Sequence, residues 1–78
     1  MTDLKETLYG IARAIVDNPD EVSIVENENG KEVKLILSVA ESDMGRVIGK
    51  NGKNAKAIRT VMKAVAASDG KRVIVDIR

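Results

Sequence analysis

The sequence predicts a small α+β domain, in which helices pack on one face of a three-stranded mixed sheet. The 78 residues allow one domain. Two long stretches carry apolar residues at helical spacing, and three shorter stretches have the apolar patterns of strands. The predicted order along the chain is α-β-β-α-α-β. A two-helix crossover between the last two strands can return the final strand parallel to its neighbour.

The first predicted element is a helix that begins near the N-terminus and ends before Asn18-Pro19. Thr2 or Asp3 can cap it, and Asp3 with Glu6 resembles a capping box. Proline ends the helix because it disfavours helical angles in the residue before it. One apolar stripe follows the helical period and needs a surface to cover it: Leu4, Leu8, Ile11, Ala12 and Ile15.

Two strands follow, and we expect them to pair as an antiparallel hairpin. The first is short, over residues 22–25, and residues 27–30 are predicted to form the turn, since Asn29-Gly30 suits positive φ. The second, over residues 32–40, alternates most clearly. Its apolar face carries Val33, Leu35, Leu37 and Val39. This strand is more apolar on both sides than the first, which predicts a central place in the sheet.

Two helices and a strand complete the prediction. A short helix over about 43–48 follows helix-start residues at 41–43 and stops at Gly49. A long helix spans about 53–68, and residues 73–77 alternate as a last strand. The stripe predicted to be buried on the long helix consists of Ile58, Val61, Met62 and Val65.

The functional prediction concerns the loop between these two helices, within residues 45–54. Gly49 and Gly52 permit a sharp turn and the close approach of a ligand to the main chain. A helix that starts after the second glycine directs unpaired N–H groups and the positive end of its dipole at the loop. Lys50 and Lys53 add full charges there. This combination suits a phosphate group.

Two structural alternatives for the loop remain open from the residues alone. Asn51-Gly52 is a common hairpin turn, and Gly49 can be the C-cap of an ordinary helix–turn–helix corner. The glycine spacing excludes a P-loop and a dinucleotide-binding fingerprint.

Composition excludes several classes of function. The chain has no Cys and no His, which removes disulfides, zinc sites made from the usual ligands, and histidine-based catalysis. We therefore expect no metal and no cofactor. No acidic residue has a convincing catalytic partner, so the sequence predicts a protein that is not an enzyme. With no Phe or Trp and one Tyr, RNA-binding modules that stack bases on aromatic side chains are disfavoured.

The charge distribution is uneven although the net charge is +1. Residues 1–43 hold ten acidic and four basic residues, a formal charge of −6, whereas residues 44–78 hold nine basic and two acidic residues, a charge of +7. This asymmetry indicates a basic face for a polyanion, although a solvated charged surface gives the same pattern. No leader and no long apolar run is present, which predicts a cytoplasmic protein with no membrane insertion.

The glycine-loop residues also resemble those of a known family. The run is Val47-Ile48-Gly49-Lys50-Asn51-Gly52. Between a short and a long helix and after an apolar strand, it resembles the Ile-Gly-x-x-Gly signature of KH domains. Helix and strand additions before the core resemble the type II arrangement. This implies one KH domain over 1–78, with an N-terminal extension over 1–30 and a KH core over 31–78. The small size and opening helix are similar to the bacterial single-KH proteins of the KhpA family.

The resemblance implies a clamp for about four nucleotides of single-stranded RNA. The residues that it implies for RNA binding are Arg46, Val47, Ile48, Gly49, Lys50, Asn51, Gly52, Lys53, Lys56 and Arg59. The glycines would admit phosphates, and the basic residues would supply charge. An aliphatic groove for bases would consist of Val47, Ile48, Ala55 and Ile58, although each of the four also suits the core. Many KH domains have a larger aliphatic residue where Ala55 stands, which implies weak base discrimination.

The resemblance also implies partners and a process. Similar proteins are RNA chaperones or post-transcriptional regulators linked to cell-envelope growth, and they self-associate or pair with a larger KhpB/Jag-like KH protein. A strip of small residues on the long helix permits close helix approach, but the same residues are simply good helix formers: Ala57, Thr60, Val61 and Ala64. The alternative function is a protein-interaction or dimerisation module whose nucleic-acid binding is weak or vestigial.

Overall fold

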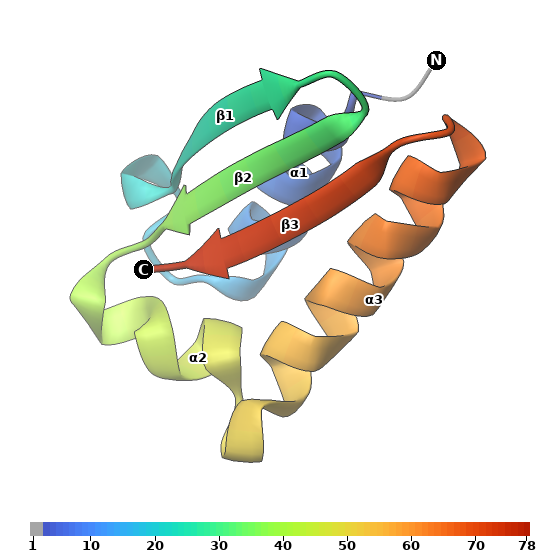
Figure 1. The fold of residues 1–78 in the computed structure, drawn as a ribbon. Helices are drawn as coiled ribbons and strands as arrows, with labels where there is room; N and C mark the ends of the chain where they lie inside the picture. Colours follow the sequence, from blue (N-terminus) through green and yellow to red (C-terminus); the bar gives the residue numbers. More distant parts are fainter. Residues whose placement is uncertain (1–2) are drawn as a thin grey trace.

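The computed structural model, which describes residues 3–78, has helices and strands in the predicted order (Figure 1). The helices are α1 (Leu4–Ile15), α2 (Met44–Ile48) and α3 (Lys53–Ser68), and the strands are β1 (Ser23–Asn29), β2 (Glu32–Ser38) and β3 (Arg72–Ile77). β2 lies at the centre of the sheet, antiparallel to β1 and parallel to β3. The helices lie on one side of the sheet (Figure 1). The predicted α+β class, strand order and central strand are confirmed.

The N-terminal helix begins as predicted. The Asp3 carboxylate accepts a hydrogen bond from the Glu6 N–H at 3.2 Å, so Asp3 is the cap of α1. Thr2, the other predicted cap, lies outside the described residues. The helix ends at Ile15, and the chain reaches β1 through a 3₁₀ turn at Pro19–Glu21. Within residues 3–78, every helix falls short of the length and apolar character that a membrane span requires.

The hairpin differs from the prediction in its turn. Residues 27–29 belong to β1, and the turn contains only Gly30 and Lys31, with Gly30 at a φ of 64°. The prediction of a turn over 27–30 was wrong. Residues 27–29 pair with β2 through their backbone, and this pairing does not depend on their polar side chains. β2 also stops at Ser38, two residues earlier than expected.

The core lies between the sheet and α1 and α3. Val33, Leu35 and Leu37 of β2 are at most 1% exposed, as the alternation predicted. β3 adds two buried valines in register with β2, Val73 opposite Val33 and Val75 opposite Leu35. Burial of these apolar side chains is the main favourable term in folding such a small domain.

The buried stripe of α3 is displaced from the predicted one. Ala55, Ile58, Met62 and Ala66 are buried, but Val61 is 47% exposed. The prediction that Val61 is a core residue was wrong, because the sheet covers a stripe centred on Ile58 and Met62 that continues to Ala66. Val61 instead lies toward α1, where it borders a shallow groove.

Asp43 is the one charged residue that is fully buried among the described residues. Its carboxylate accepts hydrogen bonds from the Asp17 N–H at 3.1 Å, and from the Asn18 N–H and the Asn18 side-chain amide, both at 3.0 Å. Burial raises the pKa of Asp43, but these hydrogen bonds and the nearby Arg46 charge together hold that pKa below its ordinary value. The residue therefore ties the segment after α1 to the start of α2, and it does not cap α2.

We expect Asp43→Ala to lower the melting temperature by roughly 5 °C or more, because three donors lose their acceptor. The pKa is depressed in the folded state, so the stabilisation is complete above the unfolded-state pKa of about 4 and is lost as the pH falls through the lower folded-state value. Thermal denaturation of both proteins from pH 7 to pH 2 should show the difference shrinking in acid. A difference that does not change with pH would contradict this role.

Candidate nucleic-acid interface

The glycine stretch forms a tight bend between two helices. α2 ends at Ile48, Gly49 adopts φ 75° and ψ 174°, and a 3₁₀ turn at Lys50–Gly52 leads directly into α3. The Gly52 N–H donates to the Gly49 carbonyl at 3.2 Å and closes the bend. The loop is therefore not a β-hairpin turn, and it lies at the surface (bottom of Figure 1, between α2 and α3).

The two glycines are required for different reasons. A Cβ on Gly49 would lie 2.7 Å from Cγ of Asn54 and 2.9 Å from the Asn54 backbone nitrogen. A Cβ on Gly52 would meet nothing within 4 Å, but its φ of 75° is one that side-chain-bearing residues rarely adopt. Asn51, at φ 57°, shares this left-handed conformation, which Asn tolerates better than most residues. Open space for a ligand is therefore found at Gly52.

The start of α3 is electrostatically suited to an anion. No side chain caps this terminus, and its first turn holds no acidic residue. Backbone N–H groups and the positive end of a 16-residue helix therefore face the loop. Lys50, Lys53 and the next basic residue on the helix, Lys56, are all exposed. The structure thus brings the predicted backbone and lysine groups together on one surface.

The basic surface continues along α3 toward the edge of the sheet. Arg59 donates through Nε to the carbonyl of Val75 in β3 at 3.2 Å, so its guanidinium is held beside the open strand edge. A recess of about 250 Å³ lies here between α3 and β3. Its lining residues are Arg59, Lys63, Val73, Ile74 and Val75. Lys63 was not among the residues that the sequence predicted for the site.

Arg46 has a partner from the N-terminal half of the chain. Its guanidinium lies 3.2 Å from the Asp17 carboxylate, and both side chains are more than half exposed. An exposed pair of this kind adds little stability. The carboxylate nevertheless offsets part of the positive charge that Arg46 brings to the loop.

The predicted aliphatic groove is mostly interior. Val47, Ala55 and Ile58 are at most 5% exposed and support the loop from within the core. As a correction to the expected groove, Val47 and Ala55 offer almost no side-chain surface to a base, and Ile58 reaches the surface only where it lines a shallow groove between α3 and α1. Ile48, at 37% exposure, is the one member of the predicted set with accessible surface.

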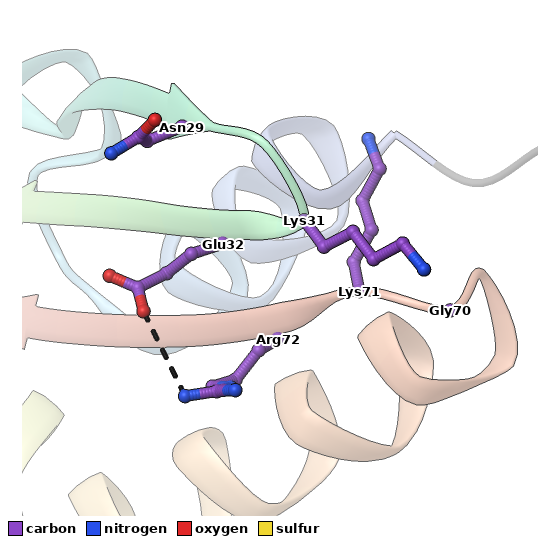
Figure 2. Close-up of a pocket in the computed structure, with 6 residues that line it drawn as sticks. All are labelled: Asn29, Lys31, Glu32, Gly70, Lys71 and Arg72. Atoms are coloured by element: carbon purple, nitrogen blue, oxygen red, sulfur yellow. Dashed lines mark ion pairs between the residues drawn. The ribbon is translucent and has the colours of Figure 1, made fainter.

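A second recess, at the far end of α3, is less suited to a polyanion. It has a volume of about 430 Å³ and is lined by Asn29, Lys31, Glu32, Gly70, Lys71 and Arg72 (Figure 2). Lys71 lies 2.8 Å from the Glu28 carboxylate, and Arg72 lies 4.0 Å from Glu32, the contact drawn in Figure 2. These carboxylates offset part of the positive charge of Lys71 and Arg72. Within residues 3–78, no cluster of three or more acidic side chains is placed to hold a metal ion.

Sequence reasoning missed Asn54. Its side-chain amide donates to the Arg46 carbonyl at 2.7 Å and so joins the two helices across the bend. The available signal was an Asn in the first turn of a helix, where its propensity is poor and a specific hydrogen bond is the usual reason for its presence.

Comparison with known proteins agrees with the topology. Residues 5–77 match the family model described as "KhpA/KhpB, KH domain". The chain belongs to the KhpA/KhpB family of KH domains. The type II KH fold implied by the glycine loop and by the N-terminal helix and strand is confirmed.

Curated relatives within the KhpA family match over nearly their full length. The RNA-binding protein KhpA of Clostridium acetobutylicum is 51% identical over 74 residues, which cover 95% of this chain and 99% of the relative. The RNA-binding protein KhpA of Bacillus subtilis is 40% identical, covering 99% and 98% of the two chains. These relatives are named as binding proteins, in a family without catalytic activity, which confirms the prediction that the chain is not an enzyme.

Solved structures of Era share the KhpA-type fold. Era of Aquifex aeolicus bound to GDP.AlF4- matches with a TM-score of 0.66 at 20% identity. Era in complex with MgGDPNP and a segment of 16S ribosomal RNA matches with a TM-score of 0.61, also at 20% identity. In both cases the match covers 95% of this chain but only 28–29% of Era, so this likeness concerns the fold alone.

We expect alanine to cost more at Gly49 than at Gly52, because Gly49 combines positive φ with a close neighbour. Left-handed backbone alone costs alanine about 1–2 kcal/mol, so Gly52→Ala should lower the unfolding free energy by that amount and Gly49→Ala by at least about twice as much. Gly10, a helical glycine with nothing near its missing Cβ, is the matched control, and Gly10→Ala should be neutral or stabilising by up to about 1 kcal/mol. Urea denaturation measures all three, and equal losses at the two loop glycines would contradict the contact with Asn54.

Proposed function

We propose that this chain binds single-stranded RNA through its glycine loop and the basic face of α3. The observation that carries the proposal is an exposed Gly49–Gly52 bend at an uncapped helix N-terminus, beside Lys50 and Lys53. Backbone N–H groups and lysines in this arrangement suit the phosphates of a sugar–phosphate strand. The curated relatives are named RNA-binding proteins, which supports RNA as the ligand.

The residues proposed to act divide into three groups. Gly49, Lys50, Asn51, Gly52 and Lys53 form the phosphate clamp. Arg46, Lys56 and Arg59 extend the positive field, and Ile48 offers an exposed aliphatic contact for a base. Val47 belongs to the proposed site through its backbone and its support of the loop, since its side chain is buried.

The proposed mode of binding favours affinity over sequence discrimination. Phosphate contacts fix a strand on the protein but carry no sequence information. With one exposed aliphatic residue, the loop provides few contacts for distinguishing bases. This suits an RNA chaperone or a post-transcriptional regulator that acts in the cytoplasm on many transcripts.

Four cations near the loop define the quantitative test. If Lys50, Lys53, Lys56 and Arg59 each neutralise a phosphate, log K should fall with log salt at a slope of about −3, so that affinity for a short single-stranded RNA drops about 50-fold between 50 and 200 mM salt. Lys50→Ala with Lys53→Ala should reduce the slope by about 1.4. Fluorescence anisotropy at several salt concentrations measures both quantities.

The matched control replaces two lysines far from the loop. Lys5 on α1 and Lys31 in the hairpin turn are both exposed, so Lys5→Ala with Lys31→Ala removes the same charge from other surfaces. This control should leave the salt dependence unchanged. Equal effects of the two double variants, or no binding by the unmodified protein at 50 mM salt, would contradict the proposed site.

We also propose self-association, with a KhpB/Jag-like KH protein as an alternative partner. Ala57, Thr60, Val61 and Ala64 on α3 are all exposed, as close helix approach requires. Val61 borders an almost entirely apolar groove of about 350 Å³ between α3 and α1. Its lining residues are Ile11, Ile15, Asn54, Ala57, Ile58 and Val61. If RNA binding proves weak, this groove supports the second candidate function, a protein-interaction module.

We expect Val61→Lys to abolish self-association, because it introduces a charge into an apolar contact without disturbing the core. Val25→Lys is the control, since Val25 is 56% exposed on the sheet face that carries no helix. Sedimentation at micromolar concentration measures the mass of each protein against the 8.4 kDa monomer. A monomeric unmodified protein, or a Val25→Lys variant that dissociates equally, would contradict the assignment to α3.

A further inference from the structure

The side chain of Asn54 occupies the inside of the glycine bend. Its Nδ2 donates to the Arg46 carbonyl at 2.7 Å, which links the first turn of α3 to the last turn of α2 across eight residues. The same carbonyl belongs to a group of helix-end acceptors that lack an intrahelical donor. The hydrogen bond therefore satisfies the Arg46 carbonyl and links the two sides of the bend.

The same side chain fills the space that Gly49 leaves. An added Cβ on Gly49 would lie 2.7 Å from Cγ and 2.9 Å from Cβ of Asn54. That face of Gly49 is consequently packed against the protein and is closed to a ligand. A phosphate has access instead around Gly52, where nothing lies within 4 Å of the missing Cβ.

We infer that Asn54 is the positioning residue of the loop, holding its N–H groups in the arrangement that receives a phosphate. The inference rests on the proposed RNA binding. It adds to the site a residue that acts without contacting the RNA. Asparagine is suited to the position because its amide donates while its length fits the space over Gly49. Alanine has no donor, and an aspartate would set a second acceptor against the Arg46 carbonyl.

The test compares Asn54→Ala with Asn27→Ala, which removes an exposed amide from β1, a strand remote from the loop in sequence and topology. Alanine favours the helix, so the melting temperature of Asn54→Ala should stay close to that of the unmodified protein. Its affinity for a short single-stranded RNA should fall by up to about tenfold, the worth of one net hydrogen bond. The salt slope should be unchanged because no phosphate contact is lost.

Hydrogen exchange without RNA gives an independent readout. The amides of Gly49 and Gly52, which donate to the Gly45 and Gly49 carbonyls, should exchange faster in Asn54→Ala than in the unmodified protein or in Asn27→Ala, since the bend has lost the hydrogen bond from Asn54 to Arg46. Faster exchange together with weaker binding at constant slope is the expected result.

Each other outcome is decisive. Unchanged exchange, or unchanged affinity while Lys50→Ala with Lys53→Ala weakens binding, overturns the role of Asn54 and leaves the proposed function intact. A reduced salt slope for Asn54→Ala also overturns it, because the residue would then contact phosphate directly. If the unmodified protein binds no RNA, the proposed function fails, and exchange alone decides whether Asn54 holds the bend.

Discussion

The parallel pairing of β2 with β3 is the constraint on which the rest of the molecule depends. To enter β3 in the same direction as β2, the chain must travel back along the sheet on one face. It does so in two helical segments, α2 and α3, which are joined by the glycine bend (Figure 1). The bend between these segments therefore lies within the crossover, and its residues Lys50 and Asn51 are exposed at the surface.

The bend is built from glycines that do different work. Gly49 has a packing role, since the Asn54 side chain lies against its bare Cα. Gly52 belongs to the surface, since its left-handed backbone starts α3 with open space beside it. The repeated glycine thus meets a packing requirement at Gly49 and a conformational requirement at Gly52, and substitutions at the two positions test these requirements separately.

Much of this structure could be predicted from local pattern. The alternation of Val33, Leu35 and Leu37 identified the central strand, and the spacing of the loop glycines between two helical stretches identified the exposed bend. The errors arose where tertiary contacts outweigh local preference. Residues 27–29 are polar but pair with β2. Val61 fits the helical stripe but lies toward α1, where it borders a shallow groove.

The contacts that hold the site together could not be read from the sequence. Asp43 was interpreted as part of a helix-start signal, but it bonds to Asp17 and Asn18, about 25 residues away. Arg46 and Asp17 are also far apart in the sequence, and the fold brings them together as an ion pair. The periodicity of a sequence does not indicate which distant segments will lie side by side. The partners of Asp43 and Arg46 could therefore be identified only from the structure.

The location of Asn54 has a consequence for how two binding events would communicate. This residue braces the loop on one side and forms part of the wall of the apolar α1–α3 groove on the other. A protein bound in that groove would contact Asn54. If it favoured one orientation of the Asn54 amide, the affinity of the loop for RNA would change. By thermodynamic reciprocity a nucleic-acid strand would then alter protein association by the same factor. The Asn54 side chain would then couple protein association to RNA binding, and the sheet would not need to move.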